Sequence, residues 1–110
     1  MLRYSLDEHN PELFKEVVRS LRKVFDPELP VNVYDLGLIY KLEIDDSGKI
    51  YVQMTLTAPN CPEAEFIPGR IHRAVWGTKG VSEVGMELVF DPPWTRDNMS
   101  TAAQLALGLI

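Results

Sequence analysis

Apolar residues follow a helical period near the start of the chain. From Pro11 onward they recur every three or four positions, which is typical of an amphipathic helix. Asn10 is expected to cap this helix, with Pro11 in the first turn, where proline is favoured. The helix is expected to end at Asp26-Pro27, because a residue before proline avoids the helical conformation. Its apolar positions are Leu13, Phe14, Val17, Val18, Leu21, Val24 and Phe25.

Two runs with a period of two come next and predict a β-hairpin. The turn between them is polar and covers residues 45–48. In the first strand, one face is expected to carry Leu38, Tyr40, Leu42 and Ile44, and the other Ile39, Lys41 and Glu43. In the second strand, Ile50, Val52, Met54 and Leu56 alternate with Tyr51, Gln53, Thr55 and Thr57.

The second half of the chain predicts a helix, a strand and a short last helix. Residues 61–76 carry Ala64, Ile67, Ile71 and Val75 at near-helical spacing. Pro68-Gly69 predicts either a bend or a short turn before a main helix from about Gly69. A third strand should then place Val84, Met86, Leu88 and Phe90 inward. The last helix is expected from Ser100 to about Leu107, closed by Gly108.

The order of elements predicts one α+β domain over residues 1–110. Its two layers would follow the order α-β-β-α-β-α, with the helices on one face of a small sheet. The crossover between the second and third strands allows them to be parallel, so we expect a mixed sheet. Residues 1–25 would form an N-terminal tail and helix, and the strand order stays open.

Charge and cysteine content narrow the functional classes. Eleven Lys and Arg against 16 Asp and Glu give a net charge of -5, which disfavours nucleic acid as a partner. We find no secretion-signal pattern and no apolar run of the roughly 18 residues needed to span a bilayer, so a membrane partner is not expected. A single cysteine agrees with a cytoplasmic location, because small secreted domains tend to pair their cysteines.

Cys61 is the only cysteine and the first candidate for chemistry. It precedes Pro62 where a strand ends and a helix begins, and a helix N-terminus lowers the pKa of a thiol. The charges of Glu63 and Glu65 oppose the thiolate, so a buried packing thiol is an equal alternative. His72 is about three helical turns away, which disfavours a cysteine–histidine hydrolase, and His9 is expected in the tail. A cysteine–histidine hydrolase is therefore not expected.

Two further segments have a structural and a functional interpretation. The acids between Asp26 and Asp35 could orient a metal, a thiol or a basic partner, but Asp-Pro and Asp-Leu-Gly also serve in turns, which we favour. Trp94 follows two prolines and could be a docking residue, or it could seal one end of the core. The sealing role is slightly favoured.

Three segments in order together resemble a known family. They are DPELPVNVYDLGLIY (26–40), TLTAPNCP (55–62) and GVSEVGMELVFDPPWTRDNMS (80–100). The chain resembles, over about residues 26–108, the MIP18-like family, formerly called domain of unknown function 59, in its members linked to SUF-type iron–sulfur cluster assembly. The resemblance implies a fold like the C-terminal domain of NifU-type scaffolds. It also implies a functional pocket of Asp26, Glu28, Thr57 and Cys61.

The same resemblance implies a role in maturing iron–sulfur proteins and does not imply catalysis, so we expect no enzyme. Cys61 would be a transient ligand of iron or of a labile cluster, with none tightly bound. Partners would be apo iron–sulfur proteins and other assembly factors, and a homodimer could supply a second ligand. The alternative is an adaptor that docks clients through Trp94 and the DPE loop without holding iron. An accessory role for a phenylacetyl-CoA oxygenase is disfavoured, because the extra C-terminal cysteines of such members are missing.

Overall fold

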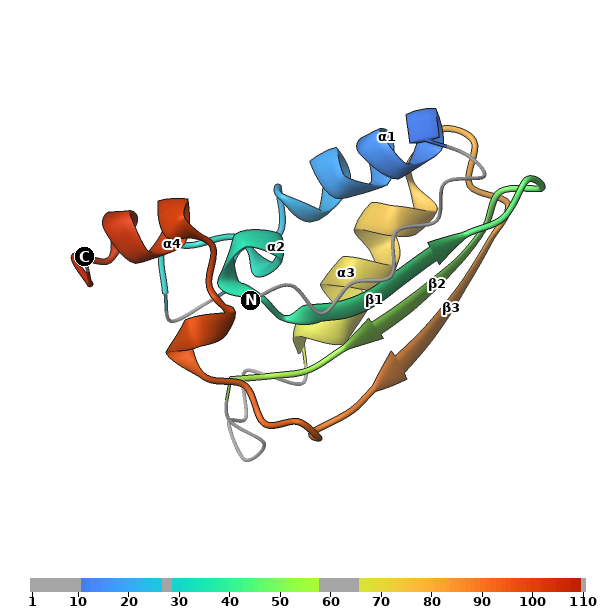
Figure 1. The fold of residues 1–110 in the computed structure, drawn as a ribbon. Coiled ribbons are helices and arrows are strands. Elements are labelled where there is room, and N and C mark those ends of the chain that lie inside the picture. The colour runs from blue at the N-terminus through green and yellow to red at the C-terminus, as the bar shows by residue number, and fades with distance from the viewer. Residues whose placement is uncertain (1–10, 27–28, 58–65, 110) are drawn as a thin grey trace.

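The computed structural model describes residues 11–26, 29–57 and 66–109. In these parts of the chain, Figure 1 shows α1 and α3 on one face of a three-stranded sheet, with α2 and α4 at the end where β1 begins. The elements are α1 (Pro11–Leu21), α2 (Val33–Leu36), β1 (Ile39–Ile44), β2 (Lys49–Met54), α3 (Phe66–Trp76), β3 (Glu83–Leu88), η2 (Arg96–Asn98) and α4 (Thr101–Ala106).

The sheet is mixed, as the sequence predicts. Its strand order is β1-β2-β3, with β1 and β2 antiparallel and β2 and β3 parallel. A parallel pair needs a crossover, and α3 provides it. Because β2 and β3 run in the same direction, their C-terminal ends lie at the same end of the sheet, where α3 begins (Figure 1). The expected α+β class is therefore confirmed.

The first helix is shorter than its apolar period predicts. It ends at Leu21, and the backbone N–H groups of Lys23 and Val24 then donate to carbonyls three residues back, as in a turn tighter than an α-helix. Phe25 then pairs with Asn32 in an isolated antiparallel bridge and is 51% exposed. The prediction that Phe25 belongs to the buried helical face is wrong. The physical reason is that residues 24–26 form backbone hydrogen bonds with residues 31–33 instead of continuing the helix.

A β-bulge changes the faces of β1. Ile39 is opposite Met54 and Lys41 is opposite Gln53, so the register shifts between Ile39 and Lys41. Residues directly opposite each other share a face, and Ile39 therefore lies on the same buried face as Leu42. The prediction that Tyr40 shares this face and that Ile39 opposes it is wrong. A bulge adds one residue to a strand, and the alternation of apolar residues in the sequence does not reveal it. Residues before the bulge therefore lie on the face opposite to the one that the alternation predicts.

The helix α3 contains Pro68-Gly69 without a break. Its buried positions are Ile67, Ile71 and Val75, as predicted, whereas Ala64 lies outside the described residues. Within the described residues, Pro68 and Gly69 both belong to α3, so the alternative of a main helix that begins only at about Gly69 is wrong. The alternative of a bend at Pro68-Gly69 stays a prediction.

The third strand is only partly buried. Val84 and Met86 pack against the core as predicted. Leu88 pairs with Met54 and so shares this face as predicted, but it stays 43% exposed. Phe90 lies beyond the end of β3 and is 45% exposed, so its predicted inward position is wrong. β3 is an edge strand, with β2 as its neighbour on one side. The last helix is confirmed: the Ser100 hydroxyl accepts from the Ala103 N–H, and Gly108 has a φ of 73°. The Leu109 N–H reaches the Gln104 carbonyl at 2.8 Å, completing a Schellman motif.

Candidate functional site

Asp26 closes the loop that follows the first helix. Its backbone N–H donates to the Val31 carbonyl at 3.2 Å, and its side-chain oxygen accepts from the Leu29 N–H at 3.1 Å. Asp26 is 8% exposed, and a buried aspartate oxygen that accepts a nearby backbone N–H is typical of a turn. The favoured turn role of Asp26 thus has a structural basis. Glu28 lies outside the described residues.

The short helix α2 is fixed at both ends. Asn32 caps its start by accepting from the Asp35 N–H at 2.9 Å, and its amide donates to the Asp35 carboxylate at 2.8 Å. Gly37 ends it with a φ of 85°, and a Cβ at Gly37 would lie 2.2 Å from the Asn98 carbonyl oxygen. Only glycine fits there, because the conformation and the space both exclude a side chain. The chain then enters β1 in a defined direction.

Thr57 lies just beyond the end of β2 and is partly exposed. It lies at the end of the sheet where β1 begins, because the Thr55 N–H donates to the Leu38 carbonyl at 2.8 Å. The Asp26 loop is joined to the same end, because the Val33 N–H donates to the Val24 carbonyl at 2.8 Å and α2 leads into β1. Thr55 itself is fully buried, and its hydroxyl has no hydrogen-bond partner among the described residues. Cys61 lies outside the described residues, so the structure brings Asp26 and Thr57 to one end of the sheet without testing the pocket.

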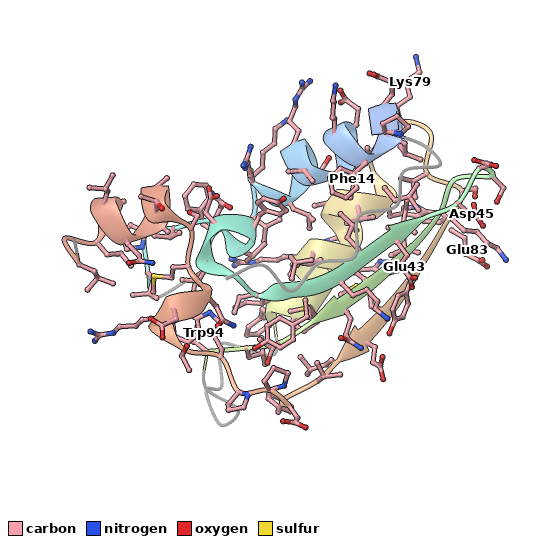
Figure 2. All side chains as sticks on the ribbon, viewed as in Figure 1. Phe14, Glu43, Asp45, Lys79, Glu83 and Trp94 are labelled. Atoms are coloured by element: carbon pink, nitrogen blue, oxygen red, sulfur yellow. The ribbon has the colours of Figure 1, made fainter. Side chains whose placement is uncertain are left out.

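The C-terminal segment 92–100 is hydrogen-bonded to α2 at this end of the molecule. The Trp94 indole donates to the Leu36 carbonyl at 2.7 Å, and the Ser100 N–H donates to the Asp35 carbonyl at 2.8 Å. Figure 2 shows Trp94 beside η2 at this end of the ribbon. Trp94 is partly buried and packs against the core, which gives the sealing interpretation a structural basis. Its partner-binding role stays a prediction.

Two polar residues that the sequence did not reveal also hold the segment. The Asn98 amide donates to the Tyr40 hydroxyl at 3.2 Å, and that hydroxyl donates to the Pro92 carbonyl at 2.8 Å. Both side chains are buried. An unusual tyrosine among the aliphatic residues of β1 was the available signal for one of them, whereas nothing in the sequence around Asn98 marks it. The Asp91-Pro92 peptide bond is cis.

Metal ligands are not gathered in the part of the chain that the structure describes. There, no three His, Cys, Asp or Glu side chains lie close enough together to hold an ion. The described helices also include none long and apolar enough to cross a membrane.

Comparison with known proteins places this fold and these motifs in a family. The model of the family described as iron-sulfur cluster assembly protein matches residues 15–86. A relative from Porphyromonas gingivalis, named Fe-S protein maturation auxiliary factor, is 51% identical over 96 residues, covering 87% of this chain and 91% of the relative. The Fe-S protein maturation auxiliary factor YitW of Bacillus subtilis is 39% identical, covering 89% of this chain and 97% of the relative.

Solved structures agree with the sequence comparison. The crystal structure of a domain of unknown function, DUF59, from Bacillus anthracis superposes with a TM-score of 0.82 at 31% identity, covering 91% of this chain and 95% of that one. The chain belongs to the iron–sulfur cluster assembly protein family, also known as DUF59 or MIP18-like. The resemblance drawn from its three motifs is therefore confirmed.

Proposed function

We propose that this chain is an accessory factor in the maturation of iron–sulfur proteins and that it handles iron or a cluster transiently through Cys61. The carrying observation is the position of its only cysteine, four residues after Thr57, in a member of the iron–sulfur cluster assembly family. The similar proteins from P. gingivalis and B. subtilis are named maturation factors, which supports a role beside other assembly proteins. Apo iron–sulfur proteins and other assembly factors are the proposed partners, in the cytoplasm.

One thiolate supplies one bond to iron, whereas clusters are commonly held by four cysteines. A second subunit, a client protein or a small thiol would have to supply further ligands. This makes a bound cluster labile, and lability suits a protein that passes its cargo on. Asp26, Glu28 and Thr57 are proposed to surround Cys61, and the shared end of the sheet for Asp26 and Thr57 supports this grouping.

Anaerobic reconstitution with iron and sulfide tests the proposal. The wild type should gain thiolate-to-iron absorption and bound iron, and Cys61→Ser should gain neither. A matched control, Cys61→Ser with Lys79→Cys, keeps one thiol per chain but moves it to the exposed loop after α3, and it should also fail. Equal iron binding by the control would contradict a site at Cys61, since any thiol would then suffice.

The adaptor alternative gives a different pattern in the same experiment. If neither the wild type nor Cys61→Ser binds iron, yet both support maturation of a client, the chain docks clients without handling iron. Trp94 and the DPE loop are the proposed contacts for that role. Substituting Trp94 should then abolish client capture while the protein stays folded.

A further inference from the structure

A groove between α1 and α2 lies outside the site proposed for Cys61. Its floor includes Val18, which is only 9% exposed, and two partly buried aromatic side chains flank it. The residues that line it are Phe14, Lys15, Val18, Arg19, Arg22 and Tyr34. Figure 2 shows Phe14 on α1, which supplies most of the lining. The groove thus combines an apolar floor with long basic side chains.

The charge of the groove is opposite to that of the whole protein. Three of its lining residues are cations and none is a carboxylate, although the chain carries a net charge of -5. Lys15 and Arg19 pair with Glu12 and Glu16 at 3.9 and 3.2 Å, one helical turn away. These pairs are solvent-exposed, and such pairs contribute little to stability. Both cations can therefore exchange these partners for a ligand at little cost.

Arg22 is held in position by α2. Its guanidinium lies 5.0 Å from the centre of the Tyr34 ring and 3.9 Å from the Asp35 carboxylate. The Asn32 amide in turn donates to Asp35, so the carboxylate is itself oriented. An arginine has five N–H donors in a planar fork that matches a carboxylate. A side chain already ordered loses less entropy on binding than a free one.

We propose that this groove docks a short acidic segment of a partner protein. Carboxylates of the segment would contact Arg19 and Arg22, and one of its apolar side chains would rest on Val18 between Phe14 and Tyr34. Charge complementarity selects this occupant, because the lining includes three cations and an apolar floor, whereas the carboxylates that pair with these cations, Glu12, Glu16 and Asp35, lie outside the lining. The surface is independent of Cys61, so it stands whether or not the protein handles iron.

Selection from random short peptides displayed on phage tests the proposal. Peptides retained on the wild type and rejected by Arg22→Glu should be enriched in Asp or Glu beside aromatic or aliphatic residues. A selected peptide, synthesised with a fluorophore, should bind Arg19→Glu with Arg22→Glu at least about tenfold more weakly, as expected for lost charge complementarity. The matched control Arg73→Glu reverses an exposed cation on α3 and should leave the affinity unchanged. Amide chemical shifts should move in residues 14–22 and 34–35.

Three results would overturn the proposal: no enriched peptide, enriched peptides without acidic residues, or equal affinity for the groove variant and the control. Sedimentation of the wild type and of Arg22→Glu tests a second copy of the chain as the occupant. A wild-type dimer that Arg22→Glu dissociates would mean that a second copy fills the groove, and it would also overturn the proposal. Arg22→Glu also disturbs Tyr34 and Asp35, so its thermal unfolding is compared first. Lys15→Glu with Arg19→Glu, which leaves the Arg22 contacts intact, replaces it if the fold is lost.

Discussion

The indole N–H of Trp94 donates a hydrogen bond to the carbonyl oxygen of Leu36, 2.7 Å away and 58 residues earlier in the chain. Leu36 is the last residue of α2, where helical carbonyls lack partners within the helix. The bond joins the C-terminal segment to the turn that leads into β1. Trp94 therefore connects two of the three motifs that mark the family.

Removing this bond should destabilise the protein. Trp94→Phe keeps an aromatic ring but leaves the Leu36 carbonyl without its donor, which should lower the free energy of unfolding by about 1–3 kcal/mol. Trp76→Phe is the matched control, because Trp76 is 55% exposed and its ring stacks with His72. The control should change stability by less than about 0.5 kcal/mol. Urea unfolding measures both, and equal effects would show that the Leu36 bond contributes little.

The buried hydroxyl of Tyr40 should contribute more to the free energy of unfolding than an exposed tyrosine hydroxyl does. Tyr40→Phe removes both the donor to Pro92 and the acceptor for Asn98, and it should cost about 1–3 kcal/mol of unfolding free energy because the buried Asn98 amide loses a partner. Tyr51→Phe removes a hydroxyl on the exposed face of the sheet and serves as the control. A double-mutant cycle of Tyr40→Phe with Asn98→Ala should reveal coupling, and strict additivity would contradict a direct contact.

Alanine substitutions at two glycines should have opposite effects on the stability of the protein. Gly37→Ala places a side chain at a φ of 85° against the Asn98 carbonyl and should destabilise by more than about 2 kcal/mol. Gly69→Ala meets no atom within 4 Å inside α3 and should be neutral or stabilising by up to about 1 kcal/mol. Calorimetry of both variants checks the pair. A stable Gly37→Ala protein would mean that α2 and η2 do not approach as closely as described.

Glu87 should titrate abnormally with Tyr51. The hydrogen bonds from the Tyr51 hydroxyl and then from Gln53 lower the pKa of Glu87, and the same Glu87 bond raises the pKa of Tyr51. The Glu87 contribution to stability is full above the ordinary glutamate pKa and is lost as pH falls through the lowered folded value. The Tyr51 contribution is full below the ordinary tyrosine pKa and is lost as pH rises through the raised one.

Carbon-13 NMR titration of the Glu87 carboxyl measures the first shift. In Tyr51→Phe the pKa of Glu87 should move up toward its ordinary value, because the largest cause of the shift is removed. Gln53→Ala should move it less. An unchanged pKa in Tyr51→Phe would contradict the hydrogen bond.

Apolar periodicity predicted the element order and most of the core, because burial of a helical or strand face repeats at the period of that element. It failed where backbone pairing decides the structure. Residues 24–26 pair with residues 31–33 instead of continuing the helical pattern. The bulge at Tyr40 reverses the face of Ile39, and the alternation of apolar residues in the sequence does not show this. The exposure of Leu88 and Phe90 depends on β3 lying at the edge of the sheet, which no local pattern reveals.

The candidate site was predicted from motifs, and the structure accounts for part of it. The turn role of Asp26 and the position of Thr57 follow from local chemistry and strand order. The contacts of Trp94 and Asn98 join segments 58 residues apart, so sequence spacing could not indicate them. Glu28 and Cys61 lie outside the described residues, and their roles remain predictions.

Transfer to an apo-ferredoxin tests the central claim most directly. Wild type loaded anaerobically with iron and sulfide is mixed with the apo-ferredoxin, and the rise of ferredoxin absorption is followed against the same iron and sulfide without the protein. The account predicts faster maturation with the wild type, and no acceleration with Cys61→Ser or with Cys61→Ser combined with Lys79→Cys. Acceleration by Cys61→Ser equal to that of the wild type would contradict the claim that Cys61 handles the cargo.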